Sequence, residues 1–310
     1  MIISASRRTD IPAFYSNWFF ERIKEGFVLV RNPVNTRQIS KVSLKRNVVD
    51  CIVFWTKNPE RMLQRLNLIN EYKYYFQFTL NPYDTYIEGN LPGKPLIIDT
   101  FKRLSDMIGP KIVIWRYDPI ILNHEIDVNY HEQHFNLLAD KLHGYTEKCV
   151  ISFVDYYKKV DRNFKALSIQ ETEDDKKRII ALKISNIARQ HNFQIESCAE
   201  SIDLSEQGIG HSRCIDPVLI QEIVGTKIRF QKDANQREHC GCIPSVDIGA
   251  YNTCAHGCIY CYANNCCKSV KKSINEYDVK SPLLCSKLTE QDRVVDKEVK
   301  PCLIKQKSEI

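Results

Sequence analysis

Three cysteines near the C-terminal end of the sequence have the spacing of a metal-cluster ligand set. Cys254, Cys258 and Cys261 follow the order C-x3-C-x2-C, and Tyr260 stands directly before the third cysteine. A short loop with this spacing can turn three thiolates toward one centre. Iron–sulfur clusters are held by cysteine thiolates, usually four of them, so three ligands would leave one iron of a four-iron cluster open. A small molecule can bind at such an iron and accept an electron.

Zinc and unliganded thiols are the alternatives for these three cysteines. Zinc usually takes paired C-x2-4-C spacings or a cysteine pair followed by a histidine pair. The N-terminus lacks a signal peptide, and no apolar run approaches the length of a membrane span, so we expect a cytoplasmic protein. In that reducing compartment the 13 cysteines stay free of disulfides, which favours metal or redox chemistry.

A second group of cysteines lies outside this spacing and consists of Cys198, Cys214, Cys240 and Cys242. Cys214 stands just before a predicted helix start at Asp216-Pro217, and a helix N-terminus favours the thiolate form. Four thiolates are enough for a second iron–sulfur cluster or for a zinc ion. The alternative is that Cys198 and Cys214 are ordinary buried cysteines, because free cysteine is among the most buried residue types.

The composition limits the classes of ligand and partner expected for the chain. Hydrophobic residues make up 43% and charged residues 26% of the 310 residues, which is the balance of an ordinary globular protein. The formal net charge of +6 is modest and fits an anionic ligand. Because the sequence has no long basic run, direct binding to nucleic acid is disfavoured.

Short apolar runs alternate with amphipathic stretches, which is the pattern of repeated βα units and a parallel sheet. Helices are predicted to run from Pro12 to a stop at Gly26, over 59–69, over 96–108, up to about residue 144, over 173–191, and from Pro217 to Gly225. We therefore predict an α/β fold, a (β/α)8 barrel of the triosephosphate isomerase (TIM) type, complete or incomplete, with an open doubly wound sheet as the alternative. The expected strands are 1–5, 27–30, 51–55, 74–80, 111–115, 149–154, 193–198 and 245–249, with 227–230 as the alternative for the last.

The chain divides into three predicted segments. Residues 1–200 carry the βα repeats, and residues 201–267 complete the barrel and include the cysteine-rich part. Residues 268–310 are rich in Lys and Asp or Glu, so we expect a loosely held tail that docks on the barrel through residues 281–284.

The carboxyl ends of the predicted strands are polar, and active sites of such barrels lie at these ends. Arginine suits bidentate binding of carboxylate or phosphate, so we expect the cations there to bind an anion. Trp55, Trp115 and Tyr117 either stack on a base or pack in the core, and His256 is expected to point to solvent rather than to a sulfur. The cations at separate strand ends are Arg7, Arg8, Arg31, Lys57 and Arg116.

The cysteine loop resembles the cluster loop of the radical S-adenosylmethionine (SAM) superfamily, and residues 254–263 are most similar to the branch that contains spore photoproduct lyase. The chain as a whole resembles an uncharacterised family, domain of unknown function 1848, which has a radical-SAM-like cysteine cluster at its C-terminal end. Further segments that match the family are residues 6–12, 54–59, 115–119 and 198–200.

This resemblance implies a [4Fe-4S] cluster on Cys254, Cys258 and Cys261, with SAM at its open iron and an electron donor such as flavodoxin or ferredoxin. Reduction would cleave SAM to a 5′-deoxyadenosyl radical, which abstracts hydrogen from a small, anionic or nucleotide-like substrate. The alternative is an iron–sulfur redox or sensor protein without SAM turnover. The cofactor-binding candidates are Tyr260, Thr9, Asp10, Arg7, Arg8 and Arg116.

The order of the chain differs from that of the radical SAM barrels. There the cluster loop follows the first strand, and a Gly-Gly-Glu-type segment after the second strand binds the SAM amino group. Here the loop follows the last predicted strand, which would lie beside the first in a closed barrel, so the same site would result from a rotated chain order. The Gly-Gly-Glu segment would then correspond to residues 6–10, which lack that sequence, and its role would fall to Thr9 and Asp10.

Overall fold

The computed structural model describes residues 1–229, 231–299 and 302. Its main element is one sheet of eight strands, in which every neighbouring pair is parallel. The strands in sheet order are β10 (Val246–Asp247), β1 (Ile2–Ala5), β4 (Cys51–Thr56), β5 (Tyr74–Thr79), β6 (Val113–Ile120), β7 (Lys148–Phe153), β8 (Gln194–Ser197) and β9 (Gly210–His211).

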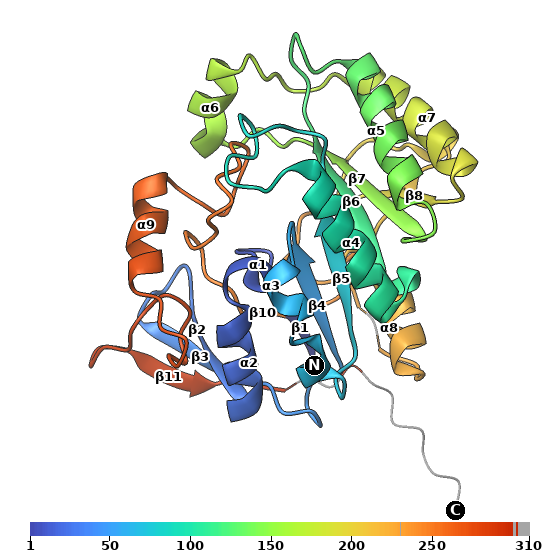
Figure 1. The fold of residues 1–310 in the computed structure, drawn as a ribbon. Coiled ribbons are helices and arrows are strands. Elements are labelled where there is room, and N and C mark those ends of the chain that lie inside the picture. The colour runs from blue at the N-terminus through green and yellow to red at the C-terminus, as the bar shows by residue number, and fades with distance from the viewer. Residues whose placement is uncertain (230, 300–301, 303–310) are drawn as a thin grey trace, which may run out of the picture.

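The strands β1 and β4 to β7 are largely apolar on both faces, which is why they read as continuous hydrophobic runs. Alternate residues contribute to two separate clusters: Ile3 and Phe54 belong to one, whereas Ile2 and Val53 belong to the other. The first cluster is covered by α4 (Lys94–Ile108), α5 (Val128–Leu142) and α7 (Asp174–Gln190), and the second by α8 (Pro217–Val224) (Figure 1).

Short helical elements connect the strands. The region after β1 forms α1 (Ile11–Phe14) and α2 (Ser16–Glu25), which ends at Gly26 with a left-handed φ of 76°. The single helix predicted over 59–69 is wrong, because the chain forms α3 (Glu60–Leu63) and then a 3-10 turn at Leu66–Ile69. The remaining short elements are α6 (Asp161–Ala166), α9 (Cys267–Asn275) and 3-10 turns at Pro110–Ile112, Lys158–Val160 and Ser205–Gln207.

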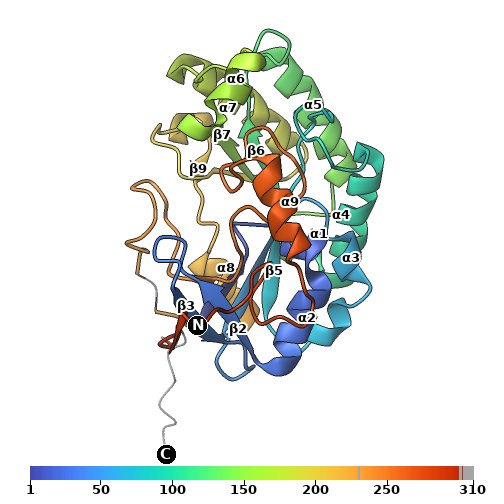
Figure 2. The same ribbon diagram turned by 90° about the vertical axis from the view of Figure 1, so that its left-hand side faces the viewer.

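The run at 27–30 is a strand, but its predicted place in the barrel is wrong. It forms β2 (Phe27–Arg31), which pairs antiparallel with β3 (Gln38–Ser43) in a separate three-stranded sheet. The connection between β2 and β3 is short, so the chain reverses direction and the two strands pair antiparallel. Parallel neighbours require a long crossover connection. This second sheet lies at the opposite end of the molecule from α5 and α7 (Figures 1 and 2). In the main sheet β9, which the sequence analysis missed, provides the eighth strand.

The segment after residue 267 is more ordered than predicted. Its docking is confirmed, because Leu283 is buried and the Leu29 amide donates to the Pro282 carbonyl. Beyond it, β11 (Arg293–Asp296) adds a parallel strand to β3. The expectation of a loose tail is therefore wrong up to residue 296, while residues 303–310 lie outside the described residues.

The order of the main sheet bears on the predicted barrel. β10 pairs in parallel with β1, so the last strand of the sheet in the chain lies beside the first, as expected. The ladder runs from β10 to β9, and the described strands include no pairing that joins these two edges. The fold is thus α/β with an eight-stranded parallel sheet. In the described residues no helix is long and apolar enough to cross a bilayer.

Candidate functional site

A polar cleft of about 1640 Å³ opens at the carboxyl ends of the main-sheet strands. Residues that follow successive strands line it, including Arg7 after β1, Lys57 after β4 and Cys198 after β8. The cysteine loop after β10 and the second cysteine group contribute to the same wall. The cleft therefore joins every residue predicted for the site: Cys254, Cys258, Cys261, Cys198, Cys214, Cys240, Cys242, Tyr260, Thr9, Asp10, Arg7, Arg8 and Arg116.

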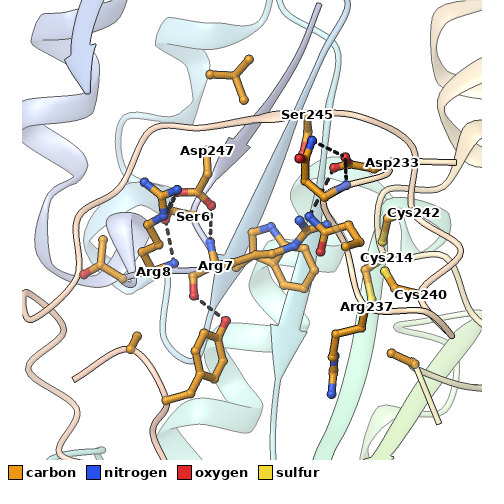
Figure 3. A pocket seen from close by; sticks show the side chains of 18 of the residues that line it. Ser6, Arg7, Arg8, Cys214, Asp233, Arg237, Cys240, Cys242, Ser245 and Asp247 are labelled. Carbon is orange, nitrogen blue, oxygen red and sulfur yellow. Dashed lines mark hydrogen bonds and ion pairs between the residues drawn. The ribbon is translucent and has the colours of Figure 1, made fainter. Parts of the chain in front are cut away.

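Asp247 at the end of β10 holds the start of the loop against β1. Its carboxylate accepts hydrogen bonds from Ser4 Oγ at 2.9 Å, Ser6 Oγ at 2.6 Å and the Arg7 amide at 2.8 Å. Gly249 follows at a place where a Cβ atom would lie 2.1 Å from Ser6 Oγ. Only glycine fits there without displacement, so the approach of the loop to β1 depends on it. Figure 3 shows Asp247 beside Ser6, Arg7 and Arg8.

The three loop cysteines are half-buried free thiols that face the cleft. Burial raises the pKa of Cys254 well above its usual value, and Asp10 and the other two loop cysteines add to the effect. Burial likewise raises the pKa of Cys258 to about 12, although Lys57 opposes it. The pKa of Cys254 thus responds to the other two thiols, and the pKa of Cys258 responds to Cys261. A bound cation would favour their thiolate forms, because metal ligands must be deprotonated.

As the side chains stand, the described residues include no group of three or more His, Cys, Asp or Glu positioned around one metal ion. A four-iron cluster makes a different demand, because each thiolate binds its own iron. The soft donor set and its place at the cleft wall fit such a cluster.

A segment between β5 and α4, residues 80–93, clamps the cysteine loop from the opposite side. Asn90 donates from its amide to the His256 carbonyl at 2.8 Å and from Nδ2 to the Ala255 carbonyl at 2.7 Å. The Ile259 amide donates to the Ile87 carbonyl at 3.0 Å. The loop that carries the three cysteines is thus held by backbone contacts on both flanks.

Glu88 is the centre of this clamp, and the sequence analysis missed it. Its buried carboxylate accepts from Lys57 Nζ at 2.7 Å, Lys94 Nζ at 2.8 Å and Tyr260 Oη at 2.5 Å. Burial acts to raise the pKa of Glu88, but the two lysines outweigh it and hold the pKa at about 2. Tyr260, predicted to bind a cofactor, therefore lines the cleft with its hydroxyl engaged. No local sequence signal marked Glu88, because Lys57 and Tyr260 come from distant segments.

The expectation that His256 points to solvent is wrong. Its side chain is buried, and Nε2 lies 2.7 Å from Asp10 Oδ2. Asp10 also accepts from the Ala13 amide, as the N-cap of α1, and from the Lys57 amide. Three donors from three segments already occupy this carboxylate, so Asp10 joins the loop, α1 and β4, whereas Thr9 Oγ1 is buried with no hydrogen-bond partner among the described residues.

Two arginines flank the indole of Trp55, which is half-buried in the cleft wall. The Arg7 guanidinium lies 5.1 Å and that of Arg116 5.3 Å from the ring centroid. Arg116 is buried, forms an ion pair with Asp118 and donates to Cys214 Sγ at 2.9 Å. Of the other aromatic candidates, Trp115 and Tyr117 are core residues.

Arg8 and Arg31 differ in pairing rather than in exposure. Arg8 lies 5.3 Å from the Tyr251 ring centroid and reaches Asp247 only at 3.9 Å. Arg31 projects from the second sheet, and Asp292 neutralises it. Arg8 is therefore the less tightly paired cation for an anionic ligand.

Four buried polar atoms along the cleft have no hydrogen-bond partner within the part of the chain that the structure describes. Buried polar atoms in proteins are almost always paired, so each exception calls for an explanation. A polar ligand in the cleft would supply the missing partners. The four atoms are Arg7 Nη2, Thr9 Oγ1, Trp55 Nε1 and His256 Nδ1.

The four cysteines of the second group meet at another part of the cleft wall. Cys198 Sγ lies 3.1 Å from Cys214 Sγ, and side-chain hydrogen bonds continue from Cys214 to Cys242 and from Cys242 to Cys240. The bond from Cys242 lowers the pKa of Cys240 to about 7. Figure 3 shows Cys214, Cys240 and Cys242 gathered on one side of the cleft.

Fold and site together define an α/β protein with a parallel eight-stranded sheet and a cysteine-rich cleft at its carboxyl edge. The chain belongs to the family described as Domain of unknown function (DUF1848), whose sequence model matches residues 2–263. A comparison with curated proteins finds no match.

Proposed function

We propose that this protein is a radical SAM-like enzyme that holds a [4Fe-4S] cluster on Cys254, Cys258 and Cys261 and binds SAM in the adjacent cleft. One observation carries the proposal: the three thiols face the same cleft as four buried polar atoms that lack hydrogen-bond partners. A three-thiolate loop leaves one iron for a ligand, and the unpaired atoms line the same cleft as the loop and could hydrogen-bond to that ligand.

Different residues of this chain would bind different parts of SAM. When bound, the cluster supplies the electron that cleaves SAM to methionine and a 5′-deoxyadenosyl radical. Arg8 suits a carboxylate because guanidinium binds it in bidentate fashion. Thr9 Oγ1 and Arg7 Nη2 would hydrogen-bond to polar groups of SAM, and the half-buried Trp55 ring offers a surface for stacking.

The size of the cleft leaves room for a second molecule. Pockets for one small ligand typically measure about 300–1,000 Å³, whereas this cleft measures about 1640 Å³. The excess volume, lined by cations, suits a small anionic or nucleotide-like substrate beside SAM. An electron donor such as flavodoxin or ferredoxin would reduce the cluster.

The test uses full-length protein reconstituted with iron and sulfide without oxygen. We expect about four irons per chain on the loop, a paramagnetic resonance signal that SAM perturbs, and 5′-deoxyadenosine after dithionite reduction. Cys258→Ala should lose the iron and the product. Cys266→Ala is the matched control, because this exposed thiol lies five residues beyond Cys261 and outside the cleft lining.

Two results would contradict the proposal. A protein that binds stoichiometric zinc and no iron under these conditions would have a different metal centre. A protein with a complete, reducible cluster that SAM neither perturbs nor reacts with would be an iron–sulfur redox or sensor protein instead.

A further inference from the structure

We propose that Cys198, Cys214, Cys240 and Cys242 form a second, four-thiolate site that binds a single zinc ion in tetrahedral geometry. This site is separate from the C-x3-C-x2-C loop and does not depend on SAM binding. The inference rests on how the four sulfurs meet, on the support of the loop that carries two of them, and on the charges around them.

The four sulfurs come from three separated parts of the chain and form one connected group. Cys198 follows β8, Cys214 precedes α8, and Cys240 and Cys242 lie in the segment between α8 and β10. Contacts join them in the order 198, 214, 242, 240, and Cys198 Sγ lies 3.1 Å from Cys214 Sγ. Cys214, Cys240 and Cys242 lie in one buried cluster, against which Cys198 packs, and the Ile215 amide next to Cys214 donates to Cys242 Sγ at 3.3 Å.

As the side chains stand, the four thiols do not surround one point, so binding a single ion requires them to shift. With Zn–S bonds of about 2.3 Å, sulfurs at the corners of a tetrahedron lie about 3.8 Å apart. Cys198 Sγ and Cys214 Sγ lie 3.1 Å apart, so they would separate by about 0.7 Å on binding zinc. A four-iron cluster puts each thiolate on a different iron and would require a larger displacement. Tetrahedral sites with four sulfurs hold zinc or an iron–sulfur centre, and the short Cys198–Cys214 distance favours zinc.

The segment that carries two of the cysteines is locally braced. The Asp233 amide donates to the Cys242 carbonyl at 2.9 Å, and the Cys240 amide donates to the Arg237 carbonyl at 3.0 Å. A Cβ atom on Gly241 would lie 3.0 Å from Arg213 Cγ, so the residue between the two cysteines has little room for a side chain. Both thiols are buried on the cleft side of this turn (Figure 3).

The surroundings are positively charged. Arg116 donates to Cys214 Sγ at 2.9 Å, and the Arg7 charge acts on Cys242 and Cys214. Asp118 offsets one of these cations, whereas Arg7 Nη2 is buried without a partner in the described residues. Buried charges are normally paired. Zinc with four thiolates carries a net charge of −2, which the neighbouring Arg7 and Arg116 guanidinium groups would stabilise.

The experiment separates this site from the first one. Full-length protein with Cys254, Cys258 and Cys261 all changed to Ala cannot load the loop, so metal found in it belongs elsewhere. We expect about one zinc ion per chain by elemental analysis, as for a structural four-cysteine site. Adding Cys214→Ser should reduce zinc at least tenfold, whereas adding Cys266→Ser should leave it unchanged. Cobalt in place of zinc should give the strong visible absorption of tetrahedral thiolate coordination.

If the Cys214→Ser variant does not fold, a second measurement on the triple variant tests the site instead. Titration of the folded triple variant with a mercurial reagent should release the zinc as four thiols react. Zinc-free folded protein, a disulfide between Cys198 and Cys214 by peptide mapping, or about four irons retained by the triple variant would each overturn the inference. None of these readouts involves SAM, so the zinc site is confirmed or refuted whether or not the protein has the proposed enzyme activity.

Discussion

Glu88→Gln is the substitution that best tests how the cysteine loop is held. Glu88 is 1% exposed and binds two lysines, of which Lys57 is 14% and Lys94 26% exposed at the side chain. Glutamine keeps the shape of the side chain and removes its charge, which leaves two cations without their anion. Breaking a buried ion pair costs about 3–5 kcal/mol. We expect the low end of this range, because solvent reaches Lys94.

The lowered pKa of Glu88 gives a similar free energy for the loss of its charge. Its pKa falls from 4.5 to about 2 on folding, and each unit is worth about 1.4 kcal/mol, so the charged state stabilises the fold by about 3 kcal/mol. Since the folded pKa is the lower one, this contribution is complete above about pH 4.5 and is lost as the pH falls toward 2. Glu88→Gln should remove that part of the acid sensitivity.

Urea unfolding followed by circular dichroism at pH 7 measures the loss. We expect Glu88→Gln to lower the free energy of unfolding by about 3 kcal/mol and to speed hydrogen exchange at the Ile259 amide in the loop. Glu60→Gln is the control, because Glu60 pairs with Arg103 at an exposed position, where such pairs are worth less than about 1 kcal/mol. Equal losses for the two variants would refute the clamp.

Two further substitutions test the geometry of the site. Gly249→Ala would place a Cβ atom 2.1 Å from Ser6 Oγ, so it should displace the loop and reduce iron loading. Gly210→Ala is the control, because the space around its Cβ position is open. Equal iron content in the two variants would contradict the close approach of the loop to β1. Arg116→Ala should destabilise the fold by about 3–5 kcal/mol, and Arg8→Ala, partly exposed, by less than about 1 kcal/mol. Thermal unfolding and SAM titration separate the two effects, and the reverse order of stabilities would show that Arg8 is the structural arginine.

Local patterns predicted most of the main sheet. Seven of the eight predicted strands lie in it, because strands buried on both faces are continuous apolar runs in the sequence. The remaining predicted strand, at 27–30, was misplaced because β2 is equally apolar in sequence, although it pairs with the hairpin strand β3 outside the main sheet. The two-residue strand β9 was too short to produce a pattern at all.

The chemistry of the site divides in the same way. The sequence by itself determined the C-x3-C-x2-C spacing and its place after a predicted strand, because residue spacing and apolar runs are local properties. The pairing of that strand with β1 joins residues 243 positions apart and is a property of the tertiary structure. Only the tertiary structure decided that Glu88 holds Tyr260, that His256 turns inward to Asp10, and that Cys198 meets Cys214. The Tyr260 and His256 contacts span 172 and 246 residues. Neither helical nor strand periodicity encodes such pairings, which arise when the sheet brings its carboxyl ends together.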